Sequence, residues 1–133
     1  MTLEVQVVSP ERILWTGDAE MVIVRTVDGG EIAFLTGHAP FVGALEIARV
    51  KVRPAEGGED QLIAVHGGFV EVSNDRVSIL SDVAETADQI DADRARRARS
   101  GAEEAVRRDA DDEDAAVAVR RAEVRLEVAG VSV

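Results

Sequence analysis

The character of the chain changes near residue 85, and this change limits what the sequence can fold into. Before it, short apolar segments alternate with glycine-containing turns, a pattern typical of β-strands. From Asp88 to Ala129 the chain consists mainly of Ala, Arg, Asp, Glu and Val, with Gly101 as the one glycine and no proline, which favours helix. The sequence therefore predicts an all-β unit over residues 1–85 followed by a helical unit over residues 86–133.

Strand signals recur through the first unit at regular spacing. Near the N-terminus, Leu3, Val5 and Val7 alternate with polar neighbours, as in a strand with one buried face. Further strands are predicted at residues 21–24, 31–35, 49–53, 62–65, 69–72 and 76–80. Gly, Asn and Asp separate these segments, because they tolerate the positive φ of tight turns. Short strands joined in this way indicate a small antiparallel β-sandwich or flattened barrel.

The second unit has the apolar spacing of two helices. The predicted apolar stripes are Ile90, Ala95, Ala98, Ala102, Ala105 and Val106 in the first helix, and Ala115, Ala118, Val119, Ala122 and Leu126 in the second. The acidic residues 109–114 suit a loop and the first turn of the second helix, and Gly130 suits its end. An antiparallel helical hairpin is expected. Because its alanine seam buries little apolar area, the second helix should detach at modest cost.

Composition and motifs argue against several functional classes. The net charge of −11 repels nucleic acid and anionic lipid, and no apolar run has the length needed for direct membrane insertion. With no cysteine and two histidines, neither a disulfide framework nor a metal site is predicted. No recognisable arrangement of nucleophile, base and acid is present, so no catalytic residue is assigned and the chain is not expected to be an enzyme.

One motif resembles part of an active site. The segment His66-Gly67-Gly68-Phe69 has the form of the turn that lines the oxyanion hole of some esterases. That function requires a G-x-S-x-G nucleophile, which the chain lacks. The segment is therefore interpreted as a tight connection between two strands.

Short motifs in a fixed order point to a known family. They are 8–12 (VSPER), Gly17, Ala19, 28–32 (DGGEI), 37–40 (GHAP), Leu45, 67–72 (GGFVEV), 77–80 (VSIL), 84–85 (AE), 90–91 (ID) and 94–95 (RA). Each motif alone is unspecific, but their order and spacing together are specific. By these motifs the chain resembles, over nearly its whole length, the epsilon subunits of bacterial F-type ATP synthases.

The resemblance implies both a fold and a role. Members of that family have an N-terminal β-sandwich and a C-terminal helical hairpin, and they bind the gamma subunit and the c-ring in the central stalk. They couple c-ring rotation to ATP synthesis in proton-translocating enzymes, without an active site, as peripheral proteins at the cytoplasmic face of the cell membrane. In several members the hairpin extends transiently toward the alpha and beta subunits and restrains ATP hydrolysis. The alternative is a stand-alone nucleotide-sensing module.

The resemblance also implies a surface that faces the c-ring. Glu31 and the segment Gly37-His38-Ala39-Pro40 would lie toward the polar loops of the ring. The alternative is that the glycine and the proline only shape a turn.

A nucleotide site is implied by a second set of residues. Some members bind ATP in the folded hairpin, and the residues that match their motifs are Glu85, Ile90, Asp91, Arg94, Ala95, Arg121 and Arg125. Gly101 stands where a further basic residue is expected. The alternative is that the pairs Asp91–Arg94 and Arg120–Glu123 are surface ion pairs of little energetic weight. No obligatory cofactor is therefore expected, and ATP binding should be weak and regulatory or absent.

Overall fold

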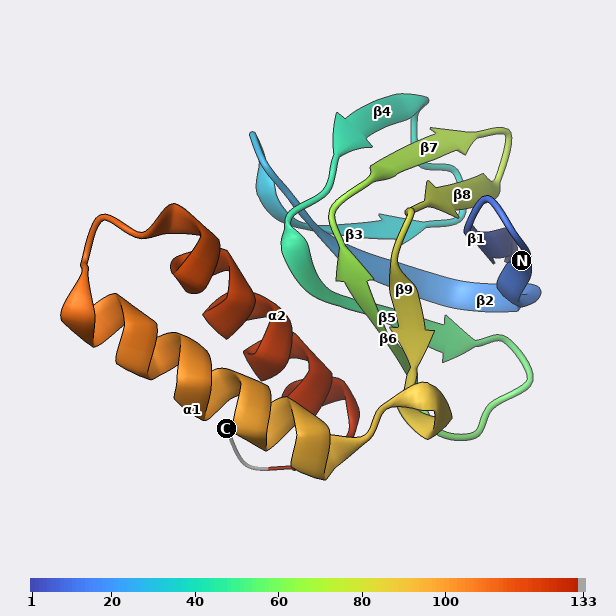
Figure 1. Ribbon diagram of the computed structural model, residues 1–133. Helices are drawn as coiled ribbons and strands as arrows, with labels where there is room; N and C mark the ends of the chain where they lie inside the picture. The colour runs from blue at the N-terminus through green and yellow to red at the C-terminus, as the bar shows by residue number, and fades with distance from the viewer. Residues whose placement is uncertain (132–133) are drawn as a thin grey trace.

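Residues 1–131, the part of the chain that the computed structural model describes, form nine strands, one short 3-10 helix and two α-helices. The strands are β1 (Leu3–Val8), β2 (Ile13–Thr26), β3 (Gly30–Leu35), β4 (Phe41–Ala44), β5 (Ile47–Pro54), β6 (Gln61–His66), β7 (Phe69–Ser73), β8 (Arg76–Leu80) and β9 (Ala84–Thr86). The helices are η1 (Ala87–Gln89), α1 (Ala92–Arg108) and α2 (Glu113–Val128). The predicted class, a β-sandwich followed by a helical hairpin, is confirmed (Figure 1).

The long strand β2 joins the two layers of the sandwich. Its first half pairs with β1, and its second half pairs with β3 and with β5. The hydrogen-bonded order is β4-β7-β8-β1-β2-β5-β6-β9, with β3 also beside β2. One layer therefore contains β4, β7, β8, β1 and the start of β2, and the other contains β3, the end of β2, β5, β6 and β9.

The core between the layers is almost entirely aliphatic. In β1 the alternating residues Leu3, Val5 and Val7 are fully buried, as their spacing predicts. Phe34 of β3 is the largest fully buried side chain. Because strand side chains alternate between faces, a register shift of one residue would move such a set into water, so this alternation specifies the pairing.

The sheet differs from the sequence prediction in two respects. The strand signals do not predict the first half of β2, β4 or β9, because these segments are short or interrupted by glycine, as at Gly17 and Gly43. The sandwich is also not wholly antiparallel, since β1 and β8 pair in parallel. A parallel pair needs a long connection, and here the chain from β2 to β7 provides it.

Aspartate side chains start both helices of the hairpin. Asp91 accepts a hydrogen bond from the backbone N–H of Arg94 at 3.1 Å, and Asp112 accepts one from Ala115 at 3.0 Å. Each satisfies an amide that has no partner within its own helix. After α2, Gly130 has a φ of 79°, which is typical of the residue that follows a helix.

The second helix packs on α1 with one face and on the sandwich with the other (Figure 1). Ala122 and Leu126 are buried on one side of α2, whereas Val124 and Val128 pack with Ala64 of β6. At about 100° per residue these two sets point in opposite directions. α2 is therefore the layer between α1 and the β-sandwich.

The predicted apolar seam of the hairpin is wrong in part. Ala95 is buried and Ala102 half-buried, as expected, but Ala98 and Ala118 are exposed. The physical reason is that alanine occurs on several sides of both helices and is tolerated equally well in water and in contacts. Alanine spacing therefore marks a helix without identifying which side is buried.

Within residues 1–131, no helix combines the length and the apolar composition of a membrane span. In the same residues, no group of acidic or histidine side chains is arranged to hold a metal ion.

Candidate functional site

A hollow at the base of the hairpin gathers most of the residues predicted to bind nucleotide. Its volume is about 350 Å³, and its lining residues are Glu85, Gln89, Asp91, Arg94, Ala95, Ala98 and Arg125. It forms where β9 leads through η1 into the start of α1 and where the end of α2 returns to the same place. The fold thus brings five of the seven predicted nucleotide residues together.

Glu85 is the central residue of this site. Its Oε1 accepts hydrogen bonds from Nε2 of His66 at 2.9 Å and from Nε of Arg125 at 2.8 Å. Because a carboxylate can only accept, the imidazole carries a hydrogen on Nε2. The hydrogen bond from His66, and then the hydrogen bond and charge of Arg125, lower the pKa of Glu85 from its ordinary value of 4.5 despite the opposing effect of burial. Glu85 is therefore an anion that joins β6 to α2.

The other predicted nucleotide residues have different surroundings. Asp91 and Arg94 form no ion pair: the Asp91 carboxylate caps α1 and the Arg94 side chain is exposed. Ile90 packs with the cluster of Ala64 and neighbouring valines, outside the hollow. Arg121 is exposed and does not line the hollow either. Of the two arginines of α2 predicted to bind nucleotide, Arg125 lines the hollow and Arg121 does not.

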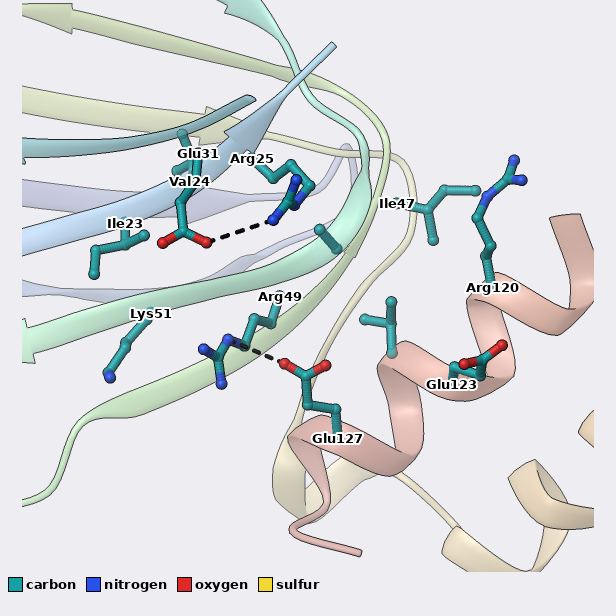
Figure 2. A pocket seen from close by; sticks show the side chains of 12 residues that line it. Ile23, Val24, Arg25, Glu31, Ile47, Arg49, Lys51, Arg120, Glu123 and Glu127 are labelled. Carbon is teal, nitrogen blue, oxygen red and sulfur yellow. Dashed lines mark ion pairs between the residues drawn. The ribbon is translucent and has the colours of Figure 1, made fainter. Parts of the chain in front are cut away.

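The ion pair considered between Arg120 and Glu123 is also not formed. Both side chains instead line a separate hollow of about 400 Å³ between α2 and the strands β2, β3 and β5. In this hollow, Nε of Arg49 lies 3.0 Å from Oε1 of Glu127, which is a second link between the sandwich and α2 (Figure 2). This pair is nearly half exposed, so its net contribution is at most about 1 kcal/mol. Four basic and three acidic side chains line this hollow, so its nearly balanced charge favours no ligand class.

The residues predicted to face the c-ring lie at opposite ends of β3. Glu31 is exposed near the start of the strand, and Oε2 lies 3.7 Å from Nη2 of Arg25. The segment 37–40 follows the end of the strand, and Ala39 and Pro40 are exposed there. A strand advances by about 3.3 Å per residue, so the structure does not bring Glu31 and this segment into one cluster.

The loop after β3 has a defined conformation. The ring of His38 packs edge-on against Phe34 with centroids 4.8 Å apart, and it also approaches Phe41. The backbone N–H of Gly37 donates to Oδ1 of Asp75 at 2.7 Å. Gly37 has a φ of 88°, which explains why glycine is needed there.

An apolar row crosses the outer face of the layer that contains β4, β7, β8, β1 and the start of β2. It consists of Ala44, Phe69, Leu80, Val8 and Ile13, each the register partner of the next across the five strands. Phe69, Leu80 and Ile13 are 59%, 48% and 55% exposed. A contiguous exposed apolar surface marks an interaction site, whereas a single exposed apolar residue does not.

A cleft of about 420 Å³ opens beside the apolar row. Its lining residues are Val8, Ser9, Pro10, His66, Gly68, Phe69, Leu80, Ser81 and Asp82. Three members of the apolar row therefore form part of its wall, and His66, whose side chain bonds to Glu85, also lines it.

Sequence reasoning did not predict the apolar row. A signal exists, because Phe69 and Leu80 occupy positions that alternate with the buried residues Val70 and Ile79 and so point outward. An outward apolar residue in one strand is ordinary. Only the register across five strands shows that these residues form one surface.

Comparisons with known proteins define the class of the β-sandwich. A family model described as "ATP synthase, Delta/Epsilon chain, beta-sandwich domain" matches residues 2–87. Among solved structures, the chain is similar to one in the mitochondrial ATP synthase of Euglena gracilis (OSCP/F1/c-ring, rotational state 1), with a TM-score of 0.69, 22% identity, and 97% of this chain and 78% of that chain covered. At this identity the structural match shows the fold. The sandwich is thus a domain of the ATP synthase delta/epsilon class.

Relatives in sequence extend the match through the helices. The chain is 43% identical over 129 residues to the ATP synthase epsilon chain of Streptomyces griseus, covering 97% of this chain and 96% of the relative. It is 44% identical over 131 residues to the epsilon chain of Bacillus licheniformis, covering 96% and 98%. The chain therefore belongs to the family of ATP synthase epsilon chains, and the resemblance stated from its motifs is confirmed.

Proposed function

We propose that the chain is a rotor subunit that couples c-ring rotation to ATP synthesis in a proton-translocating F-type ATP synthase. As a member of the epsilon family, it is a non-catalytic subunit of the rotary complex. Its lasting partners are the gamma subunit and the c-ring, and its hairpin meets the alpha and beta subunits transiently. The alternative, a stand-alone nucleotide sensor, predicts a chain that does not co-purify with gamma or with a membrane fraction.

The apolar row is the observation that carries this proposal, and we assign gamma as the subunit that covers it. Phe69 and Leu80 lie next to each other in register and are about half exposed. Large apolar side chains at the centre of an interface, beside a cleft that can receive a partner's side chain, are typical of sites that dominate binding energy. The net charge of −11 keeps the rest of the surface well solvated. If no partner covered it, the apolar row would be the surface that most favours aggregation in water.

Substitution within the row tests this assignment. Phe69→Asp should weaken binding of purified gamma at least tenfold, about 1.4 kcal/mol, because it places a charge in an apolar contact. Ala33→Asp is the matched control, since it adds the same charge to an exposed residue of β3, outside the row. Equal affinities of Phe69→Asp and the parent chain, measured by calorimetry, would show that gamma binds elsewhere.

Contact with the c-ring is proposed for Glu31 and for the segment 37–40. The ordered packing of His38 on Phe34 supports this proposal, because a preformed loop loses less entropy on binding. Glu31 and His38 lie at different ends of β3, so they are tested separately. Glu31→Cys and His38→Cys should each form a cross-link to a cysteine in the c-subunit loop, and a cysteine at the exposed Glu59 should not. A residue that cross-links no better than Glu59→Cys is not at the interface.

The proposed location is the cytoplasmic face of the cell membrane, where partner subunits hold the chain as a peripheral protein. We expect the chain to sediment with membranes and to be released together with gamma by low-salt washing. Release of the chain alone, with gamma retained, would contradict this arrangement.

The hairpin, residues 86–133, is proposed as a regulatory unit that leaves the sandwich and restrains ATP hydrolysis. The described contacts between α2 and the sandwich support it because they are few. They comprise a small apolar cluster, in which Val124 and Val128 pack with Ala64 and the partly buried Ile47 and Leu62, and the two ion pairs Arg49–Glu127 and Glu85–Arg125. Such an interface can open without loss of the main core.

Weak ATP binding in the hollow at the base of the hairpin is a second candidate function. The carboxylate of Glu85 and the guanidinium of Arg125 line the hollow, but they already bond to each other, so a phosphate has to displace that ion pair. We therefore expect a dissociation constant near 1 mM or weaker, about −4 kcal/mol. NMR titration of the chain with ATP measures it, with Arg94→Gln as a comparison. Saturation at micromolar ATP would contradict the expected weakness.

A further inference from the structure

The side chain of Asp75 joins two segments that are distant in the sequence. Asp75 lies in the turn between β7 and β8, and its Oδ1 accepts a hydrogen bond from the backbone N–H of Gly37, 38 positions away, at 2.7 Å. Gly37 begins the segment 37–40, which follows β3 and is proposed to contact the c-ring. The turn and this segment lie at the same end of the sandwich (Figure 1). One carboxylate therefore holds the proposed contact segment to a turn between strands of the other layer.

The turn itself does not favour an aspartate at position 75. Ser73 and Arg76 are register partners, so Asn74 and Asp75 form a two-residue hairpin loop, in which their φ angles are 52° and 59°. Positive φ at both positions is typical of a type I′ turn, whose preferred second residue is glycine. A residue with a side chain has a conformational cost there. The hydrogen bond to Gly37 gives a reason for the aspartate that the turn alone does not.

The backbone that carries this carboxylate is anchored to the sandwich. The carbonyl of Asp75 accepts a hydrogen bond from the N–H of Glu4 in β1 at 2.8 Å. Within the contact segment, the N–H of His38 donates to the carbonyl of Leu35 at 3.1 Å, which is a bond between near neighbours along the chain. The bond from Gly37 to Asp75 instead reaches a different part of the sandwich, and its acceptor carries a charge, which strengthens it.

We propose that Asp75 is a positioning residue that holds segment 37–40 in the conformation that contacts the c-ring. The inference rests on the c-ring contact proposed above for this segment. Without the carboxylate, the N–H of Gly37 would bond to water, and the wide φ range of glycine would let the segment adopt other conformations. A segment that is already held loses less conformational entropy on binding. Asp75 therefore raises the affinity for the ring without having to touch it.

Three substitutions in the turn separate this role from that of a turn residue. Asp75→Gly removes the acceptor but suits the positive φ, so the fold should be retained, as thermal unfolding can verify. Asp75→Asn keeps an acceptor oxygen and also tolerates positive φ. Asn74→Gly is the matched control, because it places a glycine at the other positive-φ position of the same turn and leaves the carboxylate intact.

The first measurement is the exchange rate of the Gly37 amide in the full-length chain, followed by NMR. Asp75→Gly should accelerate this exchange at least about fivefold, because an amide that has lost its hydrogen bond no longer needs an opening event. Asp75→Asn and Asn74→Gly should stay close to the parent chain. An unchanged rate in Asp75→Gly would show that the carboxylate does not hold the segment, and would overturn the proposal.

The second measurement is the Kd of the full-length chain, in complex with gamma, for purified c-rings. Asp75→Gly should weaken binding at least about threefold, Asp75→Asn should restore most of the affinity, and Asn74→Gly should bind like the parent. Equal Kd values of Asp75→Gly and the parent would overturn the positioning role. An equal loss in Asn74→Gly would also overturn it, because flexibility of the turn would then explain the effect.

Failure of the proposed c-ring contact has a different signature. In that case His38→Cys, made in a chain that retains Asp75, cross-links to the c-subunit loop no better than Glu59→Cys. If His38→Cys does cross-link to the ring and Asp75→Gly still binds the ring like the parent, the contact stands and only the role of Asp75 is wrong.

Discussion

At the scale of single residues, Glu85 joins the two parts of the chain through one carboxylate oxygen. The hydrogen bond from His66, followed by the effects of Arg125, lowers its pKa. A carboxylate with a lower pKa in the folded state stabilises the fold above its unfolded pKa of 4.5, and this contribution is lost as pH falls through the folded value. We expect Glu85→Gln to be less stable than the parent chain at about pH 7. At about pH 3 the two free energies of unfolding should become more nearly equal.

Urea unfolding of both chains at these two pH values measures the effect. Glu71→Gln, at an exposed position, is the control, and its stability difference from the parent should change little with pH. A deficit of Glu85→Gln that is the same at both pH values would mean that the carboxylate contributes by packing and not by its charge.

Gly68 is a second residue whose identity is required by its surroundings. It has a φ of 116°, and an added Cβ would collide with the carbonyl oxygen of Leu80. Gly68→Ala should therefore destabilise the fold by about 3 kcal/mol or more. Gly58→Ala has a similar φ of 93° but open space around it, so it should cost only about 1–2 kcal/mol. Thermal unfolding distinguishes the two, and equal losses would show that the collision is relieved by a small shift.

At the scale of elements, α1 is the helix of residues 1–131 that contains a glycine. Gly101 lies within it and is exposed, and an added Cβ would meet no atom within 4 Å. Gly101→Ala should stabilise α1 by about 1 kcal/mol, because glycine loses more backbone entropy in a helix. Hydrogen exchange of the α1 amides measures this, and Ser100→Ala, at the exposed neighbouring position, should give a smaller gain. Unchanged exchange in Gly101→Ala would show that α1 opens only together with the whole hairpin.

At the scale of the whole molecule, the sandwich and the hairpin differ in how firmly they are held. The sandwich has a continuous aliphatic core that extends over both of its layers, whereas the cluster between α2 and the sheet contains only three buried residues, Ala64, Val124 and Val128. Opening of the hairpin therefore exposes little apolar surface, and its cost scales with that small area. Local opening of this kind leaves the rest of the fold intact.

The regulatory role proposed for the hairpin gives a prediction for the assembled synthase. Bridging the variant Arg49→Cys/Glu127→Cys with a short thiol-reactive reagent should prevent the hairpin from extending and should raise ATP hydrolysis at least about twofold, since the restraint is removed. The two single-cysteine variants, treated with the same reagent, control for labelling and should leave the rate unchanged. Identical hydrolysis rates before and after bridging would show that this hairpin does not inhibit the enzyme.

Local patterns account for the parts of the fold that could be predicted. The alternation of Leu3, Val5 and Val7 predicts β1 because burial of a strand face has a period of two. Gly130 follows the end of α2, as predicted, because capping acts within one turn. The same reasoning does not find β4, a segment of four residues with a glycine inside it, and it misplaces Ala98, because alanine spacing does not distinguish a buried from an exposed side.

The candidate sites were predictable only in part. Asp91, Arg94 and Ala95 follow one another closely in the sequence, so a motif identifies them together. Arg121 is four residues from Arg125, yet only Arg125 reaches the hollow, because the direction of a side chain depends on how α2 packs. Glu31 and His38 are close in sequence but lie at different ends of β3, because a strand is extended.

The amino-acid sequence by itself determined the order of the parts: an all-β unit, two helices, the start and the end of the second helix, and the motifs of the epsilon family. These properties depend on near neighbours along the chain. The tertiary structure alone decided the apolar row and the path from His66 through Glu85 to Arg125, whose members are 19 and 40 positions apart. Such contacts arise from strand register and from the packing of α2, which are set by the burial of the whole core and not by any local pattern.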